Sequence, residues 1–391
     1  MIGWRAPDFW WEPRPTLAAR LLKPLGDTYA AETAGRMRRC GVTFDIPVIT
    51  IGAFALGGPG KTPMVEAIVR WLIGVGEHPA ILSRGYGSAA AKQRAPTFVN
   101  PEKHTARDVG DEPLLLTRFV PVIVGADRVE AAWHARRAVN PSVLVLDDGL
   151  QSRQIEPDLA IAVIDGEVGT GNGLCVPAGP LRAPLINQMR YVDAVLIVGP
   201  GERGAEMAQI MAVAGKPVFT AHLTPKQGEA ERFTGKPVVA FAGIGRPQKF
   251  FATLERIGAD LRARHAFADH HVYTTRELAR LEAEAHSHEA HLVTTKKDLV
   301  RIPHHHPGEP SDLGCFRDQP VGKTKSGTPD FVRGVSHNGQ RKPPLPPFET
   351  RPSALLRVRG DVDALPVELV FDNPGAFTTL LRSALRRSAK A

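Results

Sequence analysis

The chain has 391 residues, of which 43% are hydrophobic and 23% charged, and this composition excludes a chain that is disordered throughout. It is long enough for two domains, and its three cysteines (Cys40, Cys175 and Cys315) are too far apart to predict a disulfide framework or a thiolate metal site, as in a reducing cytosol. The net charge of +8 suits an acidic partner such as phospholipid, but we expect no nucleic-acid partner because the basic residues are dispersed.

Residues 1–40 have the pattern of a segment that lies on a membrane surface. Trp4, Trp10 and Trp11 are three of the five tryptophans, and they precede a helical pattern with Leu17, Leu21 and further apolar residues on one side. These 40 residues contain seven Lys or Arg and four Asp or Glu, and the resulting net positive charge would attract anionic lipid headgroups. The alternative is a helix that packs on the core, and no run reaches the ~20 apolar residues of a spanning helix.

The segment 47–71 predicts a phosphate-binding loop between a buried strand and a helix. Apolar Val48–Ile51 form the strand, and Lys61 and Thr62 begin the helix. Backbone N–H groups of such a loop converge on an anion, the lysine adds a charge and the threonine hydroxyl reaches Mg²⁺. The expected nucleotide-binding residues are Ala55, Leu56, Gly57, Gly58, Pro59, Gly60, Lys61 and Thr62. Ala55 stands where the GxxxxGK[ST] pattern has its first glycine, and an ordinary glycine-rich turn is the alternative.

Two short motifs follow that could contact substrate. Arg84 comes directly after an expected strand at 80–83, and a loop at that end of a parallel strand is a usual ligand site. Asp111 and Glu112 precede Pro113 and an apolar helical pattern. A solvated arginine and two helix-capping carboxylates are the alternatives.

Strands expected at 121–125 and 143–146, separated by a helical pattern, indicate a parallel α/β sheet. The second strand ends in Asp147 and Asp148, the position from which a Walker B element supplies carboxylates to Mg²⁺. Which of the two is the ligand stays open. Together with the GKT sequence this pair predicts a P-loop NTPase-like fold.

After strands at 159–164 and 194–198, which enclose a proline-rich loop with Arg182, a polar stretch marks an expected domain boundary near 225. Arg182 could contact a phosphorylated substrate or lie in a surface connection. We therefore expect a kinase-like domain at 41–225 and a second α/β domain at 226–391. Within the latter, 304–353 is rich in proline and glycine and predicts a disordered insertion.

The second domain carries a histidine-rich region. His270 and His271 follow Asp269 on an expected loop, and a histidine beside a carboxylate is a suitable proton acceptor. A metal site is disfavoured because His286 and His288 point apart on a helix. The TKKD sequence at 295–298 resembles a guanine-reading element, but it lies too far from the P-loop.

The motifs GGPGKTP, SRGYG, GDEP, LDDGLQ, PAGPLR, GIGRPQKFF, DHHVY and NPGAF occur in this order. With them the chain resembles the tetraacyldisaccharide 4'-kinases of lipid A synthesis over about residues 1–303 and 354–385. The resemblance implies two αβα domains and ATP-dependent phosphorylation of the 4'-hydroxyl of tetraacyldisaccharide 1-phosphate to give lipid IVA. It also implies a peripheral enzyme, expected to be a monomer, on the cytoplasmic face of the bacterial inner membrane. Ala53, Ala55 and Lys296 depart from the residues usual in this family.

The resemblance and the motifs together assign roles to single residues. We expect ATP and Mg²⁺ as cofactors, with Thr62, Asp147 and Asp148 as metal ligands and Lys61 on the β,γ-phosphates. Asp111, His270 and Asp148 are the expected catalytic residues. The resemblance implies that Asp111 takes the proton of the sugar hydroxyl and that His270, from the second domain, orients or assists it. The expected substrate contacts are Arg84, Glu112 and Arg182. The alternative function is a P-loop GTPase or ATPase switch, or a metal-chaperone NTPase.

Overall fold

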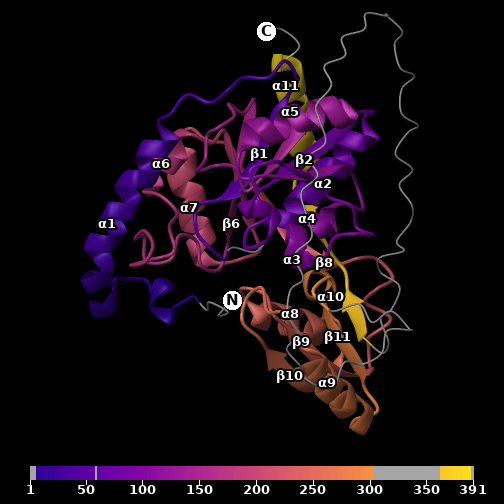
Figure 1. Ribbon diagram of the computed structural model, residues 1–391. Helices are drawn as coiled ribbons and strands as arrows, with labels where there is room; N and C mark the ends of the chain where they lie inside the picture. Colours follow the sequence, from indigo (N-terminus) through magenta and orange to yellow (C-terminus); the bar gives the residue numbers. More distant parts are fainter. Residues whose placement is uncertain (1–5, 58–59, 303–361, 389–391) are drawn as a thin grey trace, which may run out of the picture. The chain divides into compact units, whose positions relative to one another are not determined.

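This computed structural model describes residues 6–57, 60–302 and 362–388 (Figure 1). Trp4, Gly58, Pro59 and the whole of the expected insertion at 304–353 lie outside these ranges. Within them, none of the helices combines the length and hydropathy that crossing a bilayer requires.

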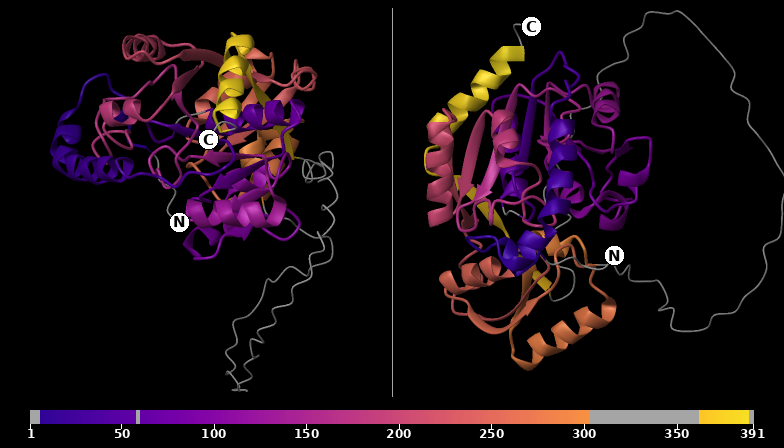
Figure 2. Two further views of the ribbon diagram at one scale, coloured as in Figure 1. Left: turned by 90° about the horizontal axis from the view of Figure 1, so that it is seen from above. Right: turned by 90° about the vertical axis from the view of Figure 1, so that its left-hand side faces the viewer.

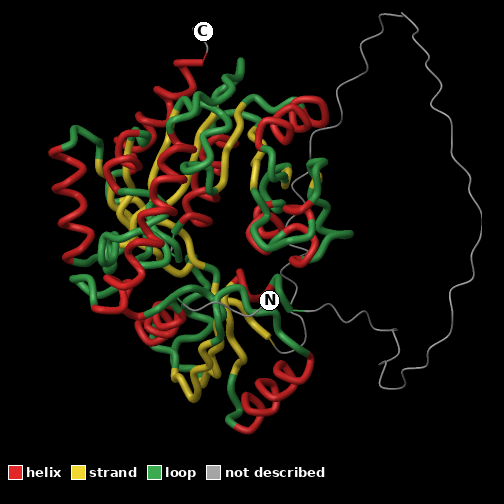
Figure 3. The backbone as a smooth tube through the Cα atoms, turned by 60° about the vertical axis from the view of Figure 1, so that its left-hand side comes forward, coloured by secondary structure: helices red, strands yellow, loops and turns green. Residues whose placement is uncertain are grey.

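A nine-stranded sheet in the order β13-β8-β7-β6-β1-β5-β2-β4-β3 forms the larger part of the chain. Its central strands are parallel and are buried along their whole length, because helices cover both faces and leave no face for polar side chains (Figure 3). Only β3 and β13 pair antiparallel, one at each edge. The strands are β1 (Val48–Ala53), β2 (Pro79–Ser83), β3 (Thr97–Phe98), β4 (Val122–Val124), β5 (Val143–Asp147), β6 (Leu159–Asp165), β7 (Ala194–Val198), β8 (Val218–Pro225) and β13 (Val367–Phe371).

The helices around this sheet bury apolar stripes against it. In α2, Met64, Ile68 and Leu72 recur at helical spacing and are fully buried. The helices are α1 (Leu17–Met37), α2 (Lys61–Gly74), α3 (Ala106–Val109), α4 (Asp111–Leu116), α5 (Arg128–Val139), α6 (Leu185–Arg190), α7 (Glu202–Val213) and α11 (Pro374–Ser388), with 3₁₀ turns η1 (Asp8–Trp10) and η2 (Ala90–Lys92). This arrangement confirms the α/β class expected from the sequence.

A second, four-stranded sheet is parallel throughout, in the order β10-β9-β11-β12. Its strands are β9 (Pro237–Ala242), β10 (Asp260–Ala266), β11 (His291–Thr295) and β12 (Val362–Leu365), and its helices are α8 (Pro247–Arg256), α9 (Thr275–Ser287) and α10 (Lys296–Leu299). After β12 the chain returns to the first sheet, where β13 pairs with β8. The C-terminal helix α11, yellow in Figure 2, buries Phe377, Leu381 and Ala384 in the same hydrophobic cluster as the apolar side chains of α2. The range expected for the second domain, 226–391, therefore includes a strand and a helix that belong with the first sheet.

The N-terminal segment differs from the expected membrane anchor at Trp10. Trp10 is fully buried, and its indole N–H donates to the carbonyl of Pro177 at 3.0 Å, so it cannot lie at headgroup depth. The expectation that Trp10 contacts lipid is wrong, because a ring with a buried hydrogen-bond partner belongs to the core. The leucines of α1 behave otherwise: Leu17, Leu21 and Leu25 are 74%, 73% and 62% exposed.

Candidate active site

The loop between β1 and α2 needs glycine for a steric reason. Gly60 caps α2 with φ of 101°, and a Cβ there would lie 3.0 Å from Val198 and 3.2 Å from Val163. Gly57 has φ of 72°, also in the left-handed region. The chain before it is held by the proline-rich loop, since Leu56 N–H donates to the carbonyl of Pro180 at 2.9 Å. The described part of the loop thus directs the N-terminus of α2 towards the carboxyl ends of the parallel strands, where anions bind.

Lys61 and Thr62 open α2 and are partly buried. The Thr62 hydroxyl lies 3.3 Å from Oε1 of Glu112, which begins α4 with Asp111. The charge of Lys61 acts on three carboxylates around it, those of Glu112, Asp147 and Asp148, and favours their ionised forms. The sequence-predicted P-loop and aspartate pair are therefore in one place, as β1 and β5 are neighbours with Ile51 opposite Asp147.

Asp147 ends β5 and is 2% exposed. Burial, together with the charges of Glu112 and Asp148, raises the pKa of its carboxyl to about 7, while Lys61 and Arg128 act in the opposite direction. Oδ2 accepts from the Ser83 hydroxyl at 3.2 Å, whereas Oδ1 is buried without a hydrogen bond in the described part of the chain. The buried guanidinium of Arg128 fixes the strand ends by donating to the carbonyls of Leu82 at 2.7 Å and Asp147 at 2.9 Å.

Asp148 is the other half of the pair and has φ of 57°, in the left-handed region. Burial alone would raise the pKa of its carboxyl, but Arg182 and Lys61 outweigh it and hold the pKa well below its usual range. Arg182 Nη1 donates to Oδ2 at 2.6 Å, and Oδ1 is buried without a hydrogen bond among the described residues.

Oδ1 of Asp147 and Oδ1 of Asp148, which make no hydrogen bond within the described ranges, are suitable ligands for a hard cation such as Mg²⁺ near Thr62 at the start of α2. No three His, Cys, Asp or Glu side chains in the described ranges could hold a metal by themselves. Mg²⁺ usually takes one or two protein carboxylates and completes its octahedron with water and phosphate oxygens.

His270 lies beside Asp111, although the two are far apart in the sequence. Its Nδ1 is 3.1 Å from Oδ2 of Asp111, which also accepts from Nε of Arg301 at 2.7 Å. Asp111 is 6% exposed; burial raises its pKa, but Lys297, Arg301 and the hydrogen bond from His270 lower it well below the usual range. His270 itself has φ of 58°, and its N–H donates to the carbonyl of Gly243 at 3.1 Å. The structure thus brings together the carboxylate and histidine that the sequence proposed as a pair.

The TKKD sequence, set aside as a guanine-reading element, organises this pair. The side chain of Asp298 is fully buried and accepts from the N–H of Gly243 at 3.0 Å and the Tyr273 hydroxyl at 2.9 Å. It also pairs with Arg301 Nη1 at 2.9 Å. Lys297 Nζ donates to Oε1 of Glu112 at 3.0 Å, and the charges of Lys297 and Lys61 both favour the ionised form of that carboxyl.

Sequence reasoning missed Arg301 and Lys297. The signal for Arg301 was its position three residues after Asp298, which places both on one helical turn. Of the expected substrate contacts, Arg182 is committed to Asp148 and Glu112 to Lys297, whereas Arg84 is exposed.

A second ionic contact lies at the opposite side of the loop. Asp165 ends β6 with 3% exposure, and it pairs with Arg246 at 2.9 Å and Lys249 at 2.6 Å, from the GIGRPQKFF sequence. In the same turn, a Cβ on Gly245 would lie 3.2 Å from the carbonyl oxygen of Gly57. The glycine turn before α8 is therefore held against the P-loop.

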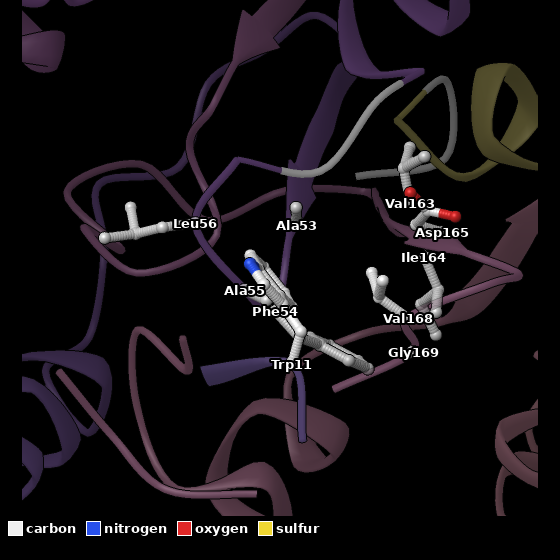
Figure 4. Close-up of a pocket in the computed structure, with 10 residues that line it drawn as sticks. All are labelled: Trp11, Ala53, Phe54, Ala55, Leu56, Val163, Ile164, Asp165, Val168 and Gly169. Carbon is white, nitrogen blue, oxygen red and sulfur yellow. The ribbon is translucent and has the colours of Figure 1, made fainter. Parts of the chain in front are cut away.

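A small pocket beside this contact is mostly apolar. Figure 4 shows Trp11 and Phe54 lying along one side of it and Val168 on the other. Its lining residues are Trp11, Ala53, Phe54, Ala55, Leu56, Val163, Ile164, Asp165, Val168 and Gly169. The two alanines that depart from the family resemblance, Ala53 and Ala55, are part of this lining.

Comparisons with known proteins identify a family that this chain resembles over most of its length. The model of the family described as Tetraacyldisaccharide-1-P 4'-kinase matches residues 18–316. A tetraacyldisaccharide 4'-kinase of Methylobacterium nodulans is 48% identical over 299 residues, 76% of this chain and 88% of that protein. One of Rhodopseudomonas palustris is 46% identical over 298 residues, 76% of this chain and 87% of that protein.

Among solved structures, LpxK from Aquifex aeolicus in complex with ATP superposes with a TM-score of 0.63 and 21% identity. The match covers 94% of this chain and 100% of that one. At this identity the likeness shows the fold alone, a P-loop αβα fold with a second sheet.

Proposed function

We infer the function of this chain from the premise that it belongs to the tetraacyldisaccharide-1-P 4'-kinase family, given the match over residues 18–316. It is a kinase of lipid A biosynthesis that transfers phosphate from ATP to the 4'-hydroxyl of tetraacyldisaccharide 1-phosphate, which gives lipid IVA. The single observation that carries this within the structure is the meeting of the Lys61 helix, the Asp147–Asp148 pair and the Asp111–His270 pair.

We propose that residues 55–62 bind the β,γ-phosphates of ATP, with Lys61 and the amides at the start of α2 as the donors. Thr62, Asp147 and Asp148 would hold Mg²⁺, which when bound neutralises the phosphate charge that develops during transfer. Arg182 keeps Asp148 ionised and so maintains a charged ligand there. Residues 41–225 would then form the kinase domain, and the second sheet would supply His270.

The Asp111–His270 pair would take the proton from the sugar hydroxyl. Arg301 and Lys297 keep Asp111 ionised, which makes it a weak base but a strong hydrogen-bond acceptor for Nδ1 of His270. That bond orients the ring, and Nε2 of His270 is then the atom that accepts the proton. Arg84, exposed after β2, would contact the substrate phosphate, and the contacts of Glu112 and Arg182 with substrate stay predictions.

Arg301 is a positioning residue in this scheme, and Arg301→Gln is expected to lower kcat about tenfold with a smaller effect on KM. The guanidinium touches Asp111, Asp298 and the carbonyl of Gly243 at once, so its loss frees Asp111 to rotate away from His270. Steady-state kinetics of Gln and Lys variants would check this. Lysine restores the positive charge but not the several N–H donors of the planar guanidinium, so Arg301→Lys should recover only part of kcat. A change in KM with an unchanged kcat would contradict the positioning role.

The activity itself is tested by comparing ATP and GTP as donors with and without the disaccharide lipid. A kinase consumes ATP only when the lipid acceptor is present and forms one phosphorylated lipid for each ATP. The alternative, an NTPase switch, predicts hydrolysis without acceptor and a preference for GTP. Acceptor-independent hydrolysis as the main reaction would overturn the kinase assignment.

We propose that α1 rests on the cytoplasmic surface of the inner membrane. A substrate with four acyl chains cannot leave the bilayer cheaply, since each buried CH₂ contributes ~0.8 kcal/mol, so the enzyme must reach it there. Leu17, Leu21 and Leu25 recur every four residues and form one exposed stripe, and Arg14 and Arg20 are exposed near its start. An apolar stripe bordered by basic residues is the pattern of an interfacial helix.

Replacement of all three leucines by serine is expected to weaken binding to anionic vesicles by about 10²-fold or more, because each buried leucine contributes about 1.5–3 kcal/mol. ATP binding should be unchanged. Co-sedimentation with vesicles would measure this, with Val213→Ser as the control, since Val213 on α7 is 91% exposed but outside the stripe. Equal sedimentation of the triple variant and the unmodified protein would remove α1 from the membrane contact.

A further inference from the structure

Four basic side chains from four separate segments gather around a single carboxylate on α2, outside the candidate active site. Arg70 Nε lies 3.0 Å and Lys226 Nζ 3.4 Å from the same oxygen of Glu66. Arg118, just after α4, and Lys296, at the start of α10, both interact electrostatically with Glu66 and with Arg70. One carboxylate against four cations leaves this basic cluster (Arg70, Arg118, Lys226 and Lys296) with three positive charges in excess.

The cluster is poorly satisfied by the protein. Arg118 Nε donates to the carbonyl of Leu115 at 3.1 Å, but its Nη2 is buried without a hydrogen bond in the described part of the chain. The guanidinium carbons of Arg70 and Arg118 lie 4.6 Å and 5.5 Å from the ring centre of Phe119, so two like charges share one ring. An unpaired buried donor costs about 1–3 kcal/mol, and mutual repulsion adds to that.

Lys296 shows the same repulsion. Burial, together with the charges of Arg118, Lys226 and Arg70, lowers the pKa of its ammonium group to about 8, while Glu66 acts in the opposite direction. No hydrogen bond or ion pair of the Lys296 side chain occurs within the described ranges. Glu66 is 13% and Lys226 27% exposed, so the cluster is recessed but open to a small solute.

We propose that the basic cluster is an anion-binding site for a phosphate group, separate from the P-loop. A phosphate offers several acceptor oxygens, enough to pair with the unbonded Arg118 Nη2 and with the lysines at the same time. Two sources share this chemistry: a free phosphate compound and the headgroup of an anionic lipid. The site does not depend on kinase activity, because none of its four cations touches the carboxylates assigned to catalysis or metal binding.

The site is also placed to influence the active site. Glu66 is one helical turn beyond Thr62 on α2, and Lys296 directly precedes Lys297, which contacts Glu112. Lys226 follows β8, where the chain leaves the first sheet, and its N–H donates to the carbonyl of Pro366, where the chain returns. A bound phosphate would therefore link α2, α10 and the connection between the two sheets.

Calorimetric titration with sulfate tests the site, since sulfate has the shape of phosphate but does not titrate near neutral pH. The P-loop is first saturated with a non-hydrolysable ATP analogue and Mg²⁺, and ionic strength is held constant with NaCl. Lys296→Gln and Lys226→Gln should each weaken sulfate binding about tenfold or more, as expected for loss of a charge-assisted hydrogen bond. Lys236→Gln is the matched control, because Lys236 is exposed after β8 and outside the cluster.

The pH dependence gives a second measurement. Binding of an anion favours charged Lys296, so sulfate affinity should fall as the pH rises from 7 to 9, and Lys296→Gln should abolish this change. Equal sulfate binding by the unmodified protein and both cluster variants, or equal weakening by Lys236→Gln, would overturn the proposal.

Vesicles of phosphatidylcholine with and without phosphatidylglycerol distinguish the two sources. If the cluster variants also lose binding to the anionic vesicles, the site takes a lipid headgroup; if they lose only sulfate, it takes a free phosphate compound.

Discussion

Replacement of Lys61 by alanine is expected to lower kcat about 10²- to 10³-fold, the magnitude typical of losing one group that stabilises transition-state charge. Lys61 begins α2, and its positive charge acts on the carboxylates of Asp147, Asp148 and Glu112. Without it, the phosphates of ATP would face three carboxylates with less compensation. Lipid phosphorylation measured at saturating ATP would report the loss.

The fold should survive this change. The charge of Lys61 is stabilised by the three carboxylates but is opposed by the dipole of the helix that it begins, and because these two effects offset each other its removal costs little stability. Thermal unfolding of Lys61→Ala should therefore show a nearly unchanged Tm, with Lys236→Ala as an exposed control for both assays. More than a few per cent of residual turnover would mean that the phosphate site has been misplaced.

Replacement of His270 by alanine is expected to lower kcat by about 10²- to 10⁴-fold, the range for loss of a general base, with a smaller change in the KM for lipid. The reason is its position: Nδ1 is 3.1 Å from Asp111, whose charge Arg301 and Lys297 maintain, and Nε2, which lies 3.9 Å from Asp269 Oδ2, is the nitrogen proposed to accept the proton. Steady-state kinetics with varied lipid at saturating ATP separates kcat from KM.

His271 is the natural comparison for this experiment, since it adjoins His270 but has other partners. Its Nε2 lies 3.2 Å from Glu277, and its ring stacks on Phe267 with centroids 4.7 Å apart. His271→Ala should keep kcat close to that of the unmodified protein, provided that its Tm shows an intact fold. If His270→Ala leaves kcat unchanged while His271→Ala lowers it, the proton acceptor is His271.

The parts of the site that depend on local order were predictable from the sequence. Gly60, Lys61 and Thr62 stand between a strand and a helix, and Asp147 and Asp148 end another strand. Because both strands are parallel and carry their polar residues at the same end, a sheet places these groups together whatever the rest of the chain does. The pairing of Asp111 with His270 rested on family resemblance, because no periodicity connects residues 159 positions apart.

Only the tertiary structure could reveal which residues hold that pair. Arg301 and Asp111 are 190 positions apart, and the TKKD sequence that leads to Arg301 resembled a base-reading motif. Only the tertiary structure likewise shows that Trp10 lies in the core and that Leu17 is exposed. From the sequence alone, an apolar residue on an amphipathic segment could face either the protein core or a membrane. The pairing of β13 with β8 in the first sheet was also visible only in the tertiary structure. Local propensity determines which segments become strands and helices, whereas burial and hydrogen bonding between distant segments decide their partners.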